Sequence, residues 1–347
     1  MLSQMDDIKA LSLETLQSKL MSFGYPRYHA RQIFNWIYKK GAVDFAQMSD
    51  LAQGLRDKLQ ENFCISGLEI VDQLKSSDGT KKMLFKLKDF SIVEGVMIPS
   101  RGRATGCIST QVGCKFGCRF CASGVSGFKR NLTYLEIIDE VLALKREALP
   151  DNLTHLVFMG TGEPLDNYGE VMKAIRIINS VDGLNIGARR ITISTSGIIP
   201  GIQKLAGEGL QIELSVSLHA ADDDLRSSLM PVNKKYSLKE LISSCKEYSV
   251  KTNRQITFEY ILIKGLNSDL KSAQDLVKLL GGWRLAKVNL IPSNPIAELK
   301  IEVPERKDIL LFKDYLEKQG LNVTLRKERG EDINAACGQL RLGYEKK

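Results

Sequence analysis

Beyond residue 132 the hydrophobic positions alternate between two spacings. Stretches with apolar residues three and four positions apart predict amphipathic helices, and short, mostly apolar runs between them predict buried strands. The predicted helices span 134–147, 169–179, 202–208, 238–248, 269–280 and 305–319, and the strands that follow them span 155–160, 189–197, 212–220, 256–265, 286–295 and 322–330. A further strand near 104–112 brings the count to about seven strand–helix steps, too few to close an eightfold barrel. We therefore predict an α/β fold built on a partial (β/α)6-type barrel of parallel strands that stays open on one side.

The first hundred residues follow other patterns. Residues from about 12 to 63 have helical spacing, which predicts a small helical domain over residues 1–64 with short helix–turn–helix units. Helix–turn–helix units bind the nucleic-acid backbone in some proteins and serve only as packing units in others. The spacing of apolar residues does not distinguish these two roles. Residues 65–100 contain short alternating runs joined at 77–79 by Ser-Asp-Gly, which predicts a β-hairpin extension. Residues 101–347 then form the barrel core and a C-terminal tail.

Small and polar residues follow several of the predicted strands. They occur at 160–164 (GTGEP), 194–197 (STSG), 217–219 (SLH) and 293–295 (SNP). Because parallel strands of such folds end at the same edge, these segments are expected to meet in one site.

Four of the seven cysteines lie in one short stretch, at Cys107, Cys114, Cys118 and Cys121. The last three are spaced C-x3-C-x2-C. Iron–sulfur clusters of the [4Fe–4S] type take thiolate ligands, and a group of three leaves one iron open to a small molecule. A structural zinc site is the alternative, but it needs a fourth Cys or His close to the triplet, and the other cysteine of this stretch, Cys107, lies seven residues before Cys114. A total of seven cysteines, an odd number, with four of them in one loop, is also unlike a secreted disulfide framework.

The positive net charge of the chain is consistent with a polyanionic partner. The formal net charge is +8, and the segment 101–130 holds six basic residues and no acidic residue. This basic stretch could stabilise thiolates, an anionic cluster or a nucleic acid, or it could be a solvated loop. The N-terminus has no apolar leader and no run is long enough to span a membrane, so we expect a cytoplasmic protein.

The cysteine triplet with Gly-Glu-Pro after the next strand resembles the radical S-adenosylmethionine superfamily. Further segments extend the likeness: MGTGEPL, RRITISTSG, SLHA, MPVNKKY, EYILI, VNLIPSNP and DINAACGQL occur in order. Together they resemble the RlmN family of RNA methyltransferases. The resemblance implies a [4Fe–4S] cluster and S-adenosylmethionine as cofactors, 23S ribosomal RNA and transfer RNA as substrates, an external electron donor such as flavodoxin, and a monomer.

The resemblance also implies residue roles. Cys114, Cys118 and Cys121 would bind the cluster; Gly162, Glu163, Ser194, Ser217, Leu218, His219 and Asn294 would bind S-adenosylmethionine. Cys337 would carry the methyl group, Cys107 would resolve the protein–RNA adduct through a transient disulfide, and Glu94 would accept the base proton. By its own surroundings Glu94 is an exposed strand carboxylate, and His219 is equally consistent with packing.

The implied reaction is methylation of adenosine at carbon 2, a carbon that is not nucleophilic and that therefore calls for radical chemistry. Reaching this atom requires an unstacked base. The Cfr branch of the family methylates carbon 8 and is the alternative. Pro164 and the Ser-Thr-Ser-Gly sequence at 194–197 favour carbon 2.

Overall fold

The computed structural model describes residues 5–125, 127–149, 151–293, 302–327 and 329–333. Its N-terminal module contains α1 (Leu13–Ser22), α2 (His29–Phe34) and α3 (Gln53–Asn62), with a π-helical turn at Asn35–Lys40 that continues α2. The Ser12 side chain caps α1 by accepting from the Thr15 amide at 3.1 Å. Two short parallel strands, β1 (Asp6–Asp7) and β2 (Phe63–Cys64), join the ends of the module. The helices agree with the spacing predicted for residues 1–64.

One ten-stranded sheet, in the order β14-β13-β12-β11-β10-β9-β6-β5-β4-β3, forms the centre of the protein. The strands are β3 (Glu69–Lys75), β4 (Lys81–Lys86), β5 (Ile92–Ser100), β6 (Arg103–Cys107), β9 (Leu153–Phe158), β10 (Ile191–Thr195), β11 (Glu213–Ser217), β12 (Ile256–Leu262), β13 (Ala286–Pro292) and β14 (Asn322–Leu325). Strands β6 and β9 to β14 are parallel, whereas β3, β4 and β5 add an antiparallel end. The sheet does not close on itself, so the predicted partial barrel is confirmed.

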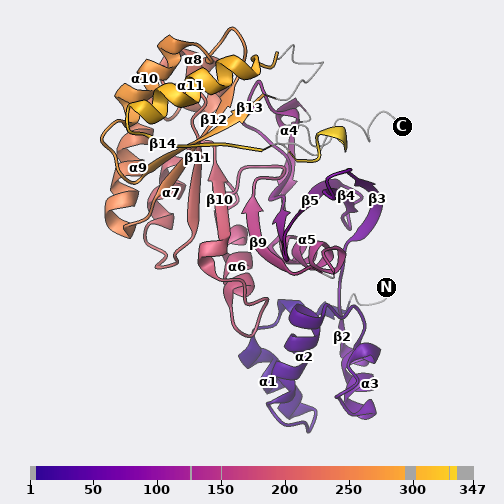
Figure 1. The fold of residues 1–347 in the computed structure, drawn as a ribbon. Coiled ribbons are helices and arrows are strands. Elements are labelled where there is room, and N and C mark those ends of the chain that lie inside the picture. Colours follow the sequence, from indigo (N-terminus) through magenta and orange to yellow (C-terminus); the bar gives the residue numbers. More distant parts are fainter. Residues whose placement is uncertain (1–4, 126, 150, 294–301, 328, 334–347) are drawn as a thin grey trace.

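Helices cover the outer face of the parallel strands (Figure 1). They are α5 (Tyr134–Glu147), α6 (Tyr168–Asn179), α7 (Ile199–Leu205), α8 (Asp223–Leu229), α9 (Leu238–Thr252), α10 (Leu270–Leu280) and α11 (Arg306–Lys318). Most of them bury an apolar face; α10, for example, buries Ala273, Leu276 and Leu280, whereas α8 buries Arg226 and Leu229. Along the described ranges, none of these helices has the length and apolarity needed to cross a bilayer.

The helical module lies at the end of the sheet opposite the short helix α4 (Ala122–Val125), which follows the cysteines (Figure 1). A buried ion pair joins the module to the barrel: Lys9 Nζ is 2.7 Å from a carboxylate oxygen of Asp139 on α5. Lys9 also pairs with Asp7 at 3.2 Å and donates to the Ser66 hydroxyl at 2.9 Å.

Candidate active site at the cysteine loop

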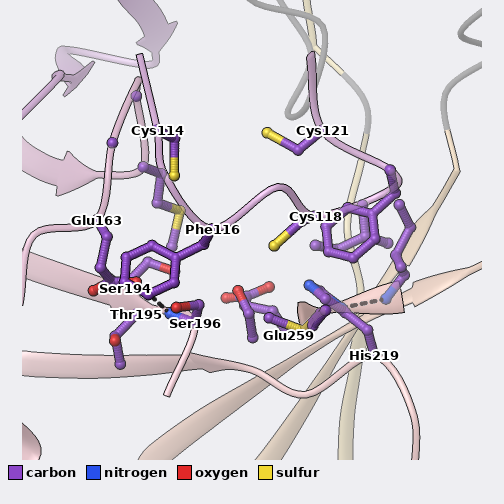
Figure 2. Close-up of a pocket in the computed structure, with 18 of the residues that line it drawn as sticks. Cys114, Phe116, Cys118, Cys121, Glu163, Ser194, Thr195, Ser196, His219 and Glu259 are labelled. Carbon is purple, nitrogen blue, oxygen red and sulfur yellow. Dashed lines mark hydrogen bonds between the residues drawn. The ribbon is translucent and has the colours of Figure 1, made fainter. Parts of the chain in front are cut away.

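The cysteine loop connects two short antiparallel strands, β7 (Gln111–Gly113) and β8 (Phe128–Asn131). Gly113 has a φ of +75°, and a Cβ there would lie 1.7 Å from the Gly127 carbonyl oxygen, so only glycine allows the two strands to meet. Within the loop, the Cys121 amide donates to the Cys118 carbonyl at 3.1 Å. Figure 2 shows the sulfur atoms of Cys114, Cys118 and Cys121 facing one common space.

All three cysteines are partly buried. Burial raises the pKa of Cys114 to about 12, and burial together with the neighbouring thiols raises the pKa of Cys118 further. Phe116 and Phe120 pack around Cys118 and form an apolar shell with Met230 and Ile261. Cysteine thiols in an apolar site lose their proton less readily than thiols in water, but they are deprotonated when they bind a metal cluster. The apolar shell limits the access of solvent to such a cluster. The residues therefore fit a cluster held by three cysteines, although no set of three metal-binding side chains in the described ranges closes on a single ion.

The Gly-Thr-Gly-Glu loop after β9 packs directly against the start of the cysteine loop. Gly162 has a φ of +107°, and a Cβ there would lie 2.6 Å from Cβ of Gln111. The next amide, that of Glu163, donates to Gln111 Oε1 at 2.9 Å. The two loops are thus locked together by a contact that only glycine permits.

Glu163 points into the pocket from this loop, and its carboxylate is held by two backbone amides. Oε1 accepts from the Leu165 amide at 3.0 Å and Oε2 from the Ser196 amide at 2.7 Å (Figure 2). Burial raises the pKa of Glu163, although these hydrogen bonds act in the opposite direction. The Ser196 and Thr195 side chains also lower its pKa through hydrogen bonds, so the carboxylate is an acceptor at the wall of the pocket.

Ser194 and Ser217 line the same pocket at the ends of the neighbouring strands β10 and β11. His219 lies just beyond β11 with a φ of +62°, and its Nδ1 accepts the Ile261 amide at 3.1 Å. Burial and the nearby Arg226 guanidinium lower the pKa of His219 to about 3. The neutral ring therefore carries its proton on Nε2, which leaves that nitrogen as a donor.

Arg226 on α8 supports this edge of the pocket, and sequence reasoning missed it. The side chain is fully buried; Nη2 donates to the carbonyls of Ser196 at 2.8 Å and Ser217 at 2.9 Å. Nε donates to the Leu218 carbonyl at 3.1 Å, and Nη1 donates to Asn233 Oδ1 at 2.6 Å. One guanidinium thus fixes the segments that follow β10 and β11. Leu218 itself packs into the hydrophobic core rather than lining the pocket.

Glu259 is a second pocket residue that was not predicted. It lies on β12 opposite Ser217, and Oε2 accepts from Asn289 Nδ2 at 2.7 Å. Burial raises its pKa. Its segment, EYILI, is among those that carry the family resemblance, and an acidic residue inside an apolar strand was the available signal.

Glu94 and Cys107 lie on one face of the sheet. Cys107 on β6 pairs with Val96 on β5, two residues from Glu94, and the Ser109 hydroxyl donates to the Glu94 carbonyl at 2.7 Å. Glu94 is only 2% exposed and lies 3.4 Å from Lys82 Nζ, so the expectation of an exposed strand carboxylate is wrong. Both faces of β5 are covered: a Cβ at the neighbouring Gly95 would contact Glu140 and Leu144 of α5. Asn294 and Cys337 lie outside the described residues.

The basic stretch 101–130 is less positive in the fold than in the sequence. Lys115 pairs with Asp166 at 2.6 Å, and Arg130 pairs with Asp89 and Glu136, each at 2.9 Å. Arg101, Arg103 and Arg119 are exposed.

Comparisons with known proteins follow the same division of the chain. Residues 6–65 match the ribosomal RNA large subunit methyltransferase N-terminal domain, and residues 108–277 match the radical SAM superfamily. Among curated relatives, probable dual-specificity RNA methyltransferases RlmN of Thermoanaerobacter sp. (strain X514) and Clostridium novyi (strain NT) are 47% and 45% identical, over 99% and 98% of this chain and 99% of theirs. A crystal structure of a radical SAM methyltransferase from Sphaerobacter thermophilus superposes with a TM-score of 0.92 at 44% identity, covering 97% of this chain and 99% of that one.

Proposed function

The chain belongs to the RlmN family of radical SAM RNA methyltransferases, and we propose that it methylates carbon 2 of adenosine in 23S ribosomal RNA and in transfer RNA. The observation that carries the proposal is the pocket at the C-terminal ends of the strands. There the three cysteine thiols meet Glu163, Ser194, Ser217 and His219, which come from separate segments of the chain. The RNA substrates and the external reductant belong to the cytoplasm, where we expect the enzyme to act.

The cofactors are assigned by the chemistry of the residues around them. Cys114, Cys118 and Cys121 would hold a [4Fe–4S] cluster. Glu163 and the Gly162 backbone would receive the ammonium group of S-adenosylmethionine, and Ser194, Ser217, His219 and Asn294 would bind its other polar groups. When bound, the cluster and S-adenosylmethionine supply the radical that activates the methyl group.

Other residues act on the methyl group and the base. Cys337 carries the methyl group as a thioether and becomes joined to the RNA base. Glu94 accepts the proton that leaves the base; its carboxylate is buried and lies 3.4 Å from Lys82 Nζ. Cys107 then attacks the Cys337 sulfur, which releases methylated RNA and forms a disulfide between the two cysteines. The position of Cys107 on the same sheet face as Glu94 supports this arrangement.

Mass mapping of RNA methylated by the reconstituted enzyme tests the position of the new methyl group. We expect a methyl group on carbon 2 of adenosine; one on carbon 8 would place the chain with the Cfr branch instead.

Single-turnover assays of cysteine variants test the covalent route. Cys337→Ala should form no methylated RNA, Cys107→Ala should accumulate a protein–RNA adduct, and Cys64→Ala is the matched control because Cys64 lies in the helical module. Methylation by Cys337→Ala would refute the methyl-carrier role, and the absence of any adduct in Cys107→Ala would refute the resolving role.

A further inference from the structure

The turn between β4 and β5 displays an aromatic side chain to solvent. Phe90 is 78% exposed and has a φ of +64°. A bulky residue with a positive φ is strained, and an exposed phenyl ring gains nothing from burial. Fold stability therefore does not explain why a phenylalanine stands at this position.

The turn is braced rather than loose. The Phe90 amide donates to the Leu87 carbonyl at 2.9 Å, and the Leu87 amide donates to the Ser91 carbonyl at 2.8 Å. Asp89 accepts from the Ser91 amide at 3.1 Å and from Arg130 Nε at 2.9 Å. The Arg130 guanidinium holds the pKa of Asp89 well below its usual range, so this brace persists at any working pH. The backbone that carries the ring is therefore held in one conformation.

This place is at the active-site end of the sheet. Strand β5 is antiparallel to β6, with Val96 paired to Cys107, so β5 begins at the end where β6 leads into the cysteine loop. Lys129 Nζ, on the strand that follows the cysteine loop, donates to the Ser91 hydroxyl at 2.6 Å. Glu94 lies on β5, four positions after Phe90.

Cations and a second exposed ring accompany Phe90. Lys86 Nζ is 5.5 Å from the centre of the Phe90 ring, and Lys115 Nζ is 5.5 Å from the centre of the Phe128 ring, which is 41% exposed. Lys88 is exposed beside Phe90. Lys86 also pairs with Glu69 at 3.1 Å, and Lys129 with Asp89 at 3.9 Å. Exposed aromatic rings with nearby cations are the means by which proteins hold single-stranded nucleic acid: the rings stack on bases and the cations meet phosphates.

We infer that Phe90 is a stacking platform for an RNA nucleotide that neighbours the target adenosine. The inference rests on the proposed RNA substrate. A base taken out of the stack leaves its neighbours without a stacking partner, and a rigid ring at the mouth of the site replaces that partner. The strained backbone at Phe90 then lowers the stability of the fold, and it holds the ring where it can contact RNA.

Stability and RNA affinity respond in opposite directions if this is correct. Phe90→Gly relaxes the positive φ and should leave the thermal midpoint unchanged or raise it. The same variant should weaken binding of an anticodon stem-loop RNA by about fivefold or more, the loss typical of one base–aromatic stack. Phe90→Trp should restore the affinity, Phe90→Leu should not, and Val250→Ala, which alters an exposed apolar side chain on α9, should change nothing.

A fluorescent base reports the stack directly. With 2-aminopurine placed in turn on each side of the target adenosine, wild-type protein should quench one position, and Phe90→Gly should lose that quenching. Equal RNA affinity of wild type and Phe90→Gly would overturn the inference, as would weaker binding with unchanged quenching at both positions. If wild-type protein neither binds nor methylates the RNA, the proposed function itself fails, and the two failures are thus distinguished.

Discussion

The Arg226 guanidinium donates to the Ser196 carbonyl at 2.8 Å from a helix thirty positions further along the chain. The same nitrogen reaches the Ser217 carbonyl, so a single side chain ties together two strand ends that line the pocket. Without Arg226 both carbonyl oxygens would be buried with no hydrogen-bond donor, and a buried acceptor without a donor lowers the stability of the folded protein. The shape of the pocket therefore depends on a residue that does not line it.

Replacing Arg226 should disturb the pocket, although its side chain does not line it. Arg226→Met leaves several buried carbonyls without donors and should lower the free energy of unfolding by about 3–5 kcal/mol. Arg226→Lys keeps the charge but loses the planar fork and should bind S-adenosylmethionine at least about tenfold more weakly while remaining folded. Urea unfolding and equilibrium dialysis measure the two effects. Wild-type affinity in Arg226→Lys would show that the fork does not position the pocket.

Gly162→Ala should uncouple the two loops of the site. The new methyl group would overlap Gln111 and would also sit on a backbone with a φ of +107°. We expect a loss of about 2 kcal/mol or more in stability and less iron bound after reconstitution. Gly169→Ala in α6 is the matched control, because a Cβ there meets nothing within 4 Å and alanine favours the helix. Full iron loading of Gly162→Ala would argue against the locking contact.

The buried His219 predicts a specific dependence of stability on pH. Its pKa in the folded protein is lowered to about 3, below the value of about 6.5 in the unfolded chain. Between these two values the unfolded chain binds a proton and the folded protein does not, so this residue makes stability fall as the pH falls from about 6.5 toward 3. It has no such effect above pH 7, where both states are neutral.

His219→Asn isolates this contribution. Asparagine tolerates the positive φ and can accept the Ile261 amide, but it does not titrate. We expect the difference in unfolding free energy between wild type and variant to change by up to about 1.4 kcal/mol per pH unit below pH 6.5. A difference that stays constant from pH 7 to pH 5 would contradict a buried, neutral His219.

Much of this site could be predicted because its signals are local. Spacing within a few residues marks the cysteine triplet, and an apolar run followed by Gly-Thr-Gly-Glu marks a strand end. The residues that were missed depend on long-range contacts. Arg226 looks like a solvated helix residue until the fold places carbonyls from two other strands around it, and the alternation around Glu94 suggests solvent because sequence does not reveal that both faces of β5 are covered.

The basic stretch shows the same limit for charge. Residues 101–130 contain no acid, but Asp89, Glu136 and Asp166 reach Lys115 and Arg130 from outside the stretch. The field that RNA meets is therefore set by tertiary ion pairs rather than by the count of basic residues along the chain.

Lys9 joins the helical module to the barrel through its ion pair with Asp139. Without Lys9, the helical module should unfold more easily than the barrel. Lys9→Met leaves the carboxylates of Asp7 and Asp139 in an interior without their cation, which should cost about 3–5 kcal/mol. The change should appear in urea unfolding and as faster proteolytic release of the module. Adding Asp139→Asn should restore part of the stability, because it removes one of the stranded charges. Lys58→Met is the matched control, since the Lys58–Glu61 pair on α3 is exposed and such pairs contribute little. If Lys9→Met behaves like this control, the module is held by its apolar contacts alone.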